Sequence, residues 1–169
     1  MLVLIGIIVG IMFFGLFTVF IGAPYVPTHR KQVQVAFDTL RPINKNDVVI
    51  DLGSGDGVVL REVSKRGARA IGVELSPIML IISKILSVGN PRITIEAKNI
   101  WKYRLPDDAT VVYAFIVSRD SVKFSSYLQK EATRLRRTLD VITYGSVIDE
   151  KRVVKRKNAH ILQKFEPLQ

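Results

Sequence analysis

The order of apolar and polar residues divides the chain into one uncharged segment followed by an alternation of short apolar runs and amphipathic stretches. Residues 2–23 carry no charged side chain, and Thr18 is the only hydroxyl-bearing residue among them. About twenty residues of apolar helix span the hydrocarbon core of a bilayer, and a buried helix of a globular domain is rarely apolar on every face. We therefore expect a single transmembrane anchor over residues 1–23.

The residues that flank this segment indicate its orientation. His29, Arg30 and Lys31 follow it closely, whereas only the amino terminus is charged before it. The positive-inside rule then places residues 24–169 on the cytoplasmic side of a membrane, or on the matrix side in an organelle. A secretory signal is a poorer interpretation, because it would need a positive start, a shorter apolar region and a cleavage site of small residues. We expect a single-pass membrane protein whose folded domain lies close to the lipid.

The rest of the chain has the periodicities of an α/β domain. Thr28 is a candidate N-cap for a helix running to about Leu40, in which Val33, Ala36, Phe37 and Leu40 share one face. Strands are expected over residues 48–51, 69–74, 92–97, 110–117, 139–147, 151–156 and 160–165, and further helices after Gly57 and over residues 77–88 and 120–137. This alternation, closed by two short strands, predicts a mostly parallel seven-stranded sheet with a C-terminal antiparallel hairpin.

A glycine-rich turn between the first expected strand and its helix carries the clearest chemical signal. Residues 48–57 read VVIDLGSGDG, so that Asp51 precedes glycines at the alternate positions 53, 55 and 57. Without side chains there, a ligand can approach the backbone closely, and the amides and dipole of the following helix can serve an anionic group. The dinucleotide spacing G-x-G-x-x-G would need a small residue where Val58 stands. The alternative is a plain tight turn.

A second acid, Glu74, stands at the end of the next expected strand, which reads RAIGVE. Open α/β sheets bind their ligands outside the carboxyl ends of the strands, and a carboxylate there can accept hydrogen bonds from both hydroxyls of a ribose. Ser76 and Pro77 then suit the N-cap and the first turn of a helix. The alternative is a solvated acid at a strand end.

The third expected strand is followed by residues that suit a purine. Asn99 can both donate and accept hydrogen bonds, which matches the mixed edge of adenine. Ile100 and Trp101 come next and can cover the face of the base. The alternative is that Asn99 is a turn residue with a buried Ile and Trp beside it.

The composition excludes several kinds of chemistry. The chain has no cysteine, which excludes disulfides, thiolate metal sites and a cysteine nucleophile. Only two histidines, His29 and His160, are present, which disfavours a histidine metal centre. We therefore expect no metal and a chemistry that rests on a bound cofactor.

The net charge of +10 is concentrated near the end of the chain. Residues 119–164 hold twelve Lys or Arg against five Asp or Glu, and residues 151–157 read KRVVKRK. Such a surface favours nucleic acid or the headgroups of anionic membrane lipid, and it is equally the pattern of a solvated strand pair with a basic face. Charge alone does not choose among these three.

The D-x-G-x-G-x-G spacing resembles the cofactor loop of the Rossmann-like class I methyltransferases, which bind S-adenosylmethionine. Within them, the chain resembles the small membrane-anchored protein-lysine methyltransferases whose mitochondrial members modify the ATP synthase c subunit and the adenine nucleotide translocase. The likeness is carried by the anchor followed by PYVPT at residues 24–28, DLGSGDG at 51–57, GVELSP at 72–77 and NIWK at 99–102. Beyond Pro106 the likeness is thin.

The resemblance implies S-adenosyl-L-methionine as cofactor and a lysine side chain of a membrane protein as acceptor. The implied cofactor-binding residues are Asp51, Leu52, Gly53, Ser54, Gly55, Asp56, Gly57, Glu74, Leu75, Asn99 and Ile100. The candidates for the substrate entrance and for substrate contacts are Pro24, Tyr25, Pro27, Thr28, Ser118, Asp120 and Tyr113. The family usually has an acid where Asn99 stands and an Asn where Ser76 stands, so the adenine contact departs from its pattern.

Three other interpretations stay open on the sequence alone. A base of RNA or DNA suits the basic end of the chain, but enzymes that act on exocyclic base amines usually carry a [D/N]-P-P-[Y/F] run after the fourth strand, where this chain reads IVSRD. Nucleic acid is therefore a disfavoured partner. A lipid or small-molecule acceptor suits the anchor equally well. A non-catalytic scaffold would have no need of the intact glycine turn and Glu74.

Overall fold

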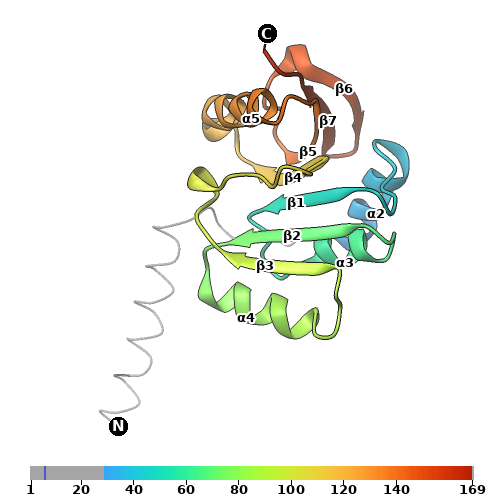
Figure 1. Cartoon of the computed structure of the whole chain (residues 1–169), viewed down its shortest axis with the longest axis vertical. Helices are drawn as coiled ribbons and strands as arrows, with labels where there is room; N and C mark the ends of the chain where they lie inside the picture. Colours follow the sequence, from blue (N-terminus) through green and yellow to red (C-terminus); the bar gives the residue numbers. More distant parts are fainter. Residues whose placement is uncertain (1–5, 7–28, 169) are drawn as a thin grey trace.

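Strands and helices alternate along the part of the chain that the structure, a computed structural model, describes, namely Gly6 and residues 29–168 (Figure 1). The helices are α2 (Arg30–Thr39), α3 (Val58–Ser64), α4 (Pro77–Leu86) and α5 (Ser121–Leu135). The strands are β1 (Val48–Leu52), β2 (Arg69–Glu74), β3 (Ile93–Ala97), β4 (Val111–Ile116), β5 (Leu139–Gly145), β6 (Val153–Lys157) and β7 (His160–Phe165). Three short 3-10 turns complete the domain: η1 (Ile100–Lys102), η2 (Ser118–Asp120) and η3 (Glu150–Arg152).

One seven-stranded sheet runs through the domain in the order β3-β2-β1-β4-β5-β7-β6. The strands from β1 to β5 are parallel, and β7 pairs antiparallel with both β5 and β6. The expected mostly parallel sheet with a C-terminal antiparallel hairpin is therefore confirmed. Because β1 lies between β2 and β4, the strand order reverses there, and open α/β sheets bind ligands at the carboxyl ends beside such a reversal.

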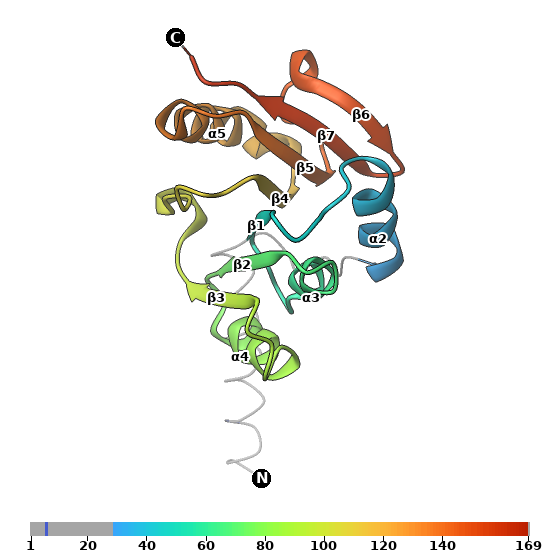
Figure 2. The same ribbon diagram turned by 45° about the vertical axis from the view of Figure 1, so that its right-hand side comes forward.

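Helices lie on both faces of the sheet (Figure 2), and an apolar cluster packs between the sheet and the helices on each face. α2 and α3 pack on one face through residues such as Phe37 and Leu60, and α5 covers the other through Phe124 and Leu128. All five residues of β1 are buried between these layers. Burial on both faces explains why VVIDL reads as an apolar run that only Asp51 interrupts.

The start of α2 differs from the sequence-based expectation. His29, and not Thr28, occupies the N-cap position, and the side chain of His29 makes no capping hydrogen bond. The carbonyl oxygen of His29 accepts the N–H of Gln32 at 2.8 Å and that of Val33 at 3.2 Å. The prediction of Thr28 as the cap was wrong, because the extended backbone of His29 already accepts the first helical hydrogen bonds.

Two strand boundaries also differ, each for a local reason. β5 ends at Gly145, whose φ of 102° turns the chain out of the sheet, where the sequence predicted a strand to residue 147. β6 begins at Val153, because η3 occupies the preceding residues. The side chain of Asp149 stabilises η3 by accepting the N–H of Lys151 at 3.0 Å.

The expected transmembrane segment, residues 1–23, lies outside the described residues apart from Gly6. Its prediction therefore stays a prediction. Within the described part of the chain, no helix combines the length and the apolar character that crossing a membrane requires.

Candidate functional site

The glycine turn between β1 and α3 is wound through left-handed backbone conformations. Gly53, Gly55 and Gly57 have φ angles of 88°, 52° and 80°, which glycine adopts far more readily than other residues. The N–H groups of Gly53 and Ser54 donate to the carbonyl oxygen of Val73 on β2, at 2.8 and 3.2 Å. These bonds hold the turn at the carboxyl ends of β1 and β2.

The glycines of the turn differ in what a side chain would meet. A Cβ atom on Gly53 would have no other atom within 4 Å, whereas one on Gly57 would lie 2.3 Å from the Oγ atom of Ser83 on α4. Gly53 is exposed and Gly57 is buried. Gly53 therefore leaves the outer side of the turn open to a ligand, and Gly57 allows α4 to pack against the turn. Sequence reasoning did not single out Ser83.

The carboxylate of Glu74 is bonded to the backbone around it. Its Oε2 accepts the N–H of Gly55 at 2.9 Å, and its Oε1 accepts the N–H groups of Leu75 and Ser76, each at 2.8 Å. Ser76 is the N-cap of α4 as expected, but its hydroxyl makes no capping bond. A carboxylate has about four acceptor positions, so about one remains for a ligand hydroxyl. Accepting both hydroxyls of a ribose would require one of the three backbone bonds to be shared.

Asp51 is a buried acid beside this turn. Its side chain is 3% exposed, and no donor among the described residues bonds to its carboxylate. Burial, together with the negative charges of Glu74 and Asp56, raises the pKa of Asp51 well above its usual range. A positively charged ligand group would relieve this repulsion. Within the described part of the chain, no group of three or more metal-ligating side chains is placed to hold an ion.

Asp56 is held at the start of α3 by Arg61. The guanidinium of Arg61 donates to the carbonyl oxygen of Asp56 at 2.6 Å and lies 3.3 Å from its carboxylate. The same carboxylate accepts the N–H of Val58 at 3.2 Å. Arg61 was not expected at the site, because nothing in its spacing from the glycines distinguishes it from other basic residues of the helix.

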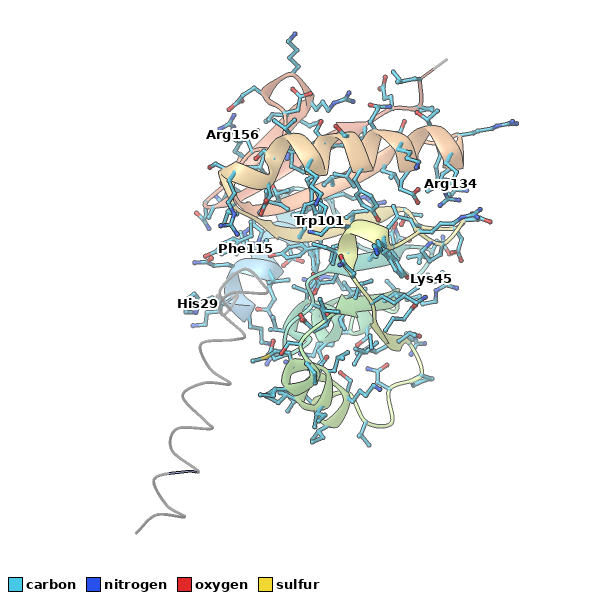
Figure 3. All side chains as sticks on the ribbon, turned by 90° about the vertical axis from the view of Figure 1, so that its left-hand side faces the viewer. His29, Lys45, Trp101, Phe115, Arg134 and Arg156 are labelled. Carbon is cyan, nitrogen blue, oxygen red and sulfur yellow. The ribbon has the colours of Figure 1, made fainter. Side chains whose placement is uncertain are left out.

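Asn99 stabilises η1 through its side chain. Its Oδ1 accepts the N–H of Trp101 at 2.9 Å, so its amide N–H₂ group and one further acceptor position of Oδ1 are left for a ligand. Ile100 and Trp101 pack against the cluster on the α5 side, where the ring of Trp101 meets that of Phe124 edge-on at 5.7 Å. Figure 3 views the molecule from the side at which the parallel strands end, and Trp101 lies near the centre of that view. The bonding fits the turn-residue alternative, and the adenine contact stays a prediction.

The expected substrate entrance is described only in part. Pro24, Tyr25, Pro27 and Thr28 lie outside the described residues. Ser118 and Asp120 lie in η2, directly after the carboxyl end of β4 and therefore at the same edge as the glycine turn. The Oγ of Ser118 is 3.0 Å from that of Ser146, and the carboxylate of Asp120 is 3.6 Å from Arg119.

Tyr113 lies inside the domain. It is 1% exposed, and its hydroxyl is 2.8 Å from Nε2 of His160 on β7. The ring of Tyr144 lies against the same imidazole, with a centroid distance of 4.8 Å. Burial lowers the pKa of His160 to about 4, so the imidazole is neutral at pH 7. These contacts favour a structural role for Tyr113 over a substrate contact.

Proteins with similar sequences carry names that state the same activity, that of a lysine N-methyltransferase. The chain is 30% identical over 113 residues to a protein-lysine N-methyltransferase of Saccharolobus islandicus, and the match covers 64% of this chain and 69% of that protein. It is also 38% identical over 61 residues, 36% of this chain, to the ATP synthase c-subunit lysine N-methyltransferase of Xenopus laevis. That match spans 26% of the length of the Xenopus protein. No protein-family model matches the chain.

A solved structure shares the architecture of the described domain. The RNA methyltransferase from Salinibacter ruber, in complex with S-adenosyl-L-homocysteine, superposes with a TM-score of 0.74 and 18% sequence identity. The superposition covers 85% of this chain and 95% of that one. At this identity the likeness shows the fold alone, and it confirms the Rossmann-like methyltransferase fold that the sequence predicted.

Proposed function

This chain belongs to the protein-lysine N-methyltransferases, and we propose that it transfers a methyl group from S-adenosyl-L-methionine to a lysine side chain of a membrane protein. One observation carries the proposal: a glycine turn in left-handed conformations lies between two acids, Asp51 and Glu74, at the carboxyl edge of the sheet. The names of the relatives support a protein lysine as the acceptor.

The residues around the turn fit this cofactor. Gly53 leaves the outer side of the turn open, and the buried hydroxyl of Ser54, which has no partner among the described residues, is available to a polar group. Glu74 keeps about one acceptor position for a ribose hydroxyl. We assign the cofactor to Asp51, Leu52, Gly53, Ser54, Gly55, Asp56, Gly57, Glu74, Leu75, Asn99 and Ile100.

The electrostatics of the turn suit a cation. S-adenosyl-L-methionine, when bound, supplies a methyl group activated by a positively charged sulfonium. Asp51 and Glu74 raise the local negative potential, and their mutual repulsion is one cause of the raised pKa of Asp51. A positive charge beside Asp51 lowers that pKa and favours the ionised carboxylate, so the acid and the cation stabilise each other.

The acceptor lysine must present an unprotonated amine. Because the pKa of a lysine side chain is about 10.4, removing its proton at neutral pH costs about 4 to 5 kcal/mol, and burial beside a positive charge reduces this cost. The task of the chain is then to hold the amine in line with the methyl group and to exclude water, without a dedicated base. Ser118 and Asp120, at the end of β4, and residues 24–28 are the proposed contacts.

Membrane anchoring by residues 1–23 is part of the proposal, with the folded domain on the cytoplasmic or matrix side. Only residues 24–28 separate the uncharged segment from His29. At about 3.3 Å per residue these five residues extend to roughly 17 Å, which keeps the domain next to the lipid. Such proximity favours acceptors in a membrane protein, and it equally suits a lipid as a second candidate acceptor.

An RNA acceptor has one observation in its favour. The side chains of Lys155, Arg156 and Lys157 are exposed on β6 and form a basic surface. We rank it below the lysine acceptor because the relatives named above act on protein lysine.

The test is the transfer of radiolabelled methyl groups from S-adenosyl-L-methionine into native membranes, which are then separated into protein, lipid and RNA fractions. We expect label in protein with the wild type and none with Asp51→Ala. Label in lipid or RNA would be consistent with the cofactor assignment, but it would overturn the proposal that the acceptor is a protein lysine. No label in any fraction, with cofactor binding measured separately and intact, would contradict the proposed activity.

A further inference from the structure

Helix α4 exposes most of its apolar side chains to solvent. Ile78, Ile81, Ile85 and Leu86 are 46%, 59%, 65% and 52% exposed, and we call these four residues the α4 face. Nine large apolar side chains are exposed in the described part of the chain, and six of them lie between residues 75 and 88. Scattered exposed apolar residues are ordinary, but such a concentration marks an interaction surface.

The helix is oriented with a polar side chain inward. Ser83 is fully buried, and its hydroxyl, which has no partner among the described residues, lies against Gly57. On the side of the helix opposite Ser83 lie Ile81 and Ile85, each two residues away from it. They are the two most exposed residues of the α4 face. An amphipathic helix on a soluble domain has the opposite arrangement. The isoleucines therefore face outward, where a soluble domain would present polar side chains.

The charges around α4 suit a lipid surface. Lys84 and Arg92 are the only charged residues from Leu75 to Ile95, and both are exposed and positive. Helices that lie in the membrane interface combine an apolar face with neighbouring basic residues, which are attracted to anionic headgroups.

We propose that the α4 face is a membrane-docking surface, which lies in the interface of the same bilayer that residues 2–23 span. The inference rests on the anchoring proposed above, and it commits to lipid as the occupant. Under the anchoring proposed above, residues 2–23 lie across the bilayer and are not the cover of this ten-residue helix. Docking gives the domain a second attachment besides the anchor.

Docking through α4 also orients the site. The helix begins three residues after Glu74, and the Glu74 carboxylate bonds to the two N–H groups between them. A bilayer against α4 is therefore adjacent to the carboxyl edge of the sheet, where the glycine turn lies. This placement restricts the acceptor to lysines close to the membrane surface.

The β6–β7 hairpin, which carries the basic residues Lys155, Arg156 and Lys157, is a competing membrane contact. It lies at the other end of the molecule. α4 packs beside the edge strand β3, and β6 is the opposite edge strand of the sheet. Figures 1 and 2 both show α4 and β6 at opposite ends. A flat bilayer cannot contact both, so docking through α4 leaves Lys155, Arg156 and Lys157 facing water.

The absence of cysteine from the chain allows a direct test with single labels. Ile81→Cys and Ile85→Cys, each carrying one fluorophore, report on the α4 face in the full-length protein. Val122→Cys is the matched control, because Val122 is 79% exposed on α5, and Lys155→Cys reports on the hairpin. Each protein is reconstituted into phosphatidylcholine vesicles with a minority of phosphatidylglycerol, with or without brominated acyl chains, and its association is checked by flotation.

We expect brominated lipid to quench the labels at 81 and 85 several-fold more than those at 122 and 155. Equal quenching at all four positions, or quenching at 155 alone, would overturn the docking surface. Protection of position 81 from both brominated lipid and aqueous iodide would also overturn it, by revealing a protein cover. Failure to float would refute the anchor and the docking together. None of these measurements needs cofactor or acceptor. A failure of membrane docking can therefore be distinguished from a failure of methyl transfer.

Discussion

The backbone N–H of Gly55 donates a hydrogen bond of 2.9 Å to Oε2 of Glu74, which joins the glycine turn after β1 to the acid at the end of β2. The other oxygen of that carboxylate accepts the N–H groups of Leu75 and Ser76 at the start of α4. One side chain therefore fixes both the turn and the helix. The residue expected to contact the ribose therefore also organises the glycine turn.

Replacing Glu74 by Gln tests this double role. The amide keeps the shape of the side chain but has only one acceptor oxygen, so an N–H₂ group would face a backbone N–H. We expect the free energy of unfolding of the variant to be about 1 to 3 kcal/mol below that of the wild type. We also expect its affinity for S-adenosyl-L-methionine to be about 10- to 100-fold weaker. Denaturant titration and calorimetric binding measure the two effects.

Glu96→Gln is the matched control for Glu74→Gln. Glu96 lies on the neighbouring strand β3, where it accepts the hydroxyl of Tyr103 at 3.0 Å and pairs with Lys98. We expect this variant to keep its affinity for the cofactor. An equal loss of affinity in both variants would mean that general destabilisation, and not the place of Glu74, weakens binding.

Gly57→Ala is expected to destabilise the protein more than Gly53→Ala. Both substitutions put a side chain on a left-handed residue, but only the one at 57 also drives a Cβ atom to 2.3 Å from Oγ of Ser83. We expect the additional loss to be about 1 to 2 kcal/mol, measured by denaturant unfolding without cofactor. Ser83→Ala in the Gly57→Ala background should recover part of it, whereas additive losses would show that the contact does not matter.

Asp51→Asn should stabilise the protein without cofactor at neutral pH. Because burial and neighbouring acids raise the pKa of Asp51, the folded state holds the proton more tightly than the unfolded state. Folding stability is then lost as the pH rises from about 3.9 toward the folded pKa, and a neutral Asn escapes this loss. Urea unfolding over a pH series should show an advantage for the variant that grows with pH.

Asp47→Asn is a control in which folding stability should change in the opposite direction. Although burial opposes it, hydrogen bonds from Arg41, the N–H of Asn44 and Thr110 lower the pKa of Asp47. That carboxylate contributes stability above the ordinary Asp pKa, which the variant should lose at neutral pH. If Asp51→Asn behaved like Asp47→Asn, the Asp51 carboxylate would have stabilising partners, and our account of it would be wrong.

His160 should make the fold sensitive to mild acid. Because burial lowers the pKa of His160 to about 4, the unfolded state takes up the proton first as the pH falls below the ordinary value near 6.5. We expect a loss of about 2 kcal/mol in the free energy of unfolding between about pH 7.5 and about pH 5. His160→Gln keeps a group that can bond to Tyr113 and should remove most of this difference. A pH dependence that survives the substitution would assign it to other groups.

Much of the fold follows from the sequence because the periodic segments are also the buried ones. The observed β2 and β7 have the bounds that the sequence predicted, Arg69–Glu74 and His160–Phe165. The boundaries that were missed, at Thr28 and around η3, depend on hydrogen bonds of single residues, which no apolar pattern reveals.

The sequence predicted where the candidate residues lie on the sheet, but it did not predict how they are bonded. The spacing of glycines and acids brings Asp51, Gly55 and Glu74 to one edge, as expected. That Glu74 and Asn99 already accept backbone N–H groups could not be predicted, because local side-chain to backbone bonds depend on the exact turn geometry.

The outward face of α4 was also beyond sequence reasoning. Seven of its ten residues are apolar, other than its proline, so the pattern predicts a helix without choosing which side packs on the sheet. The choice depends on Ser83 fitting against Gly57, a contact between residues that are 26 positions apart.

Mass spectrometry of the methylated acceptor is the sharpest test of methyl transfer to a lysine of a membrane protein. Native membranes are incubated with the full-length protein and S-adenosyl-L-methionine carrying a deuterated methyl group, beside an Asp51→Ala control, and the proteins are digested and sequenced. We predict deuterated methyl groups on a lysine side chain of a membrane protein with the wild type, and none with the variant. Deuterium only in lipid or RNA, or on a protein residue other than lysine, would contradict the account.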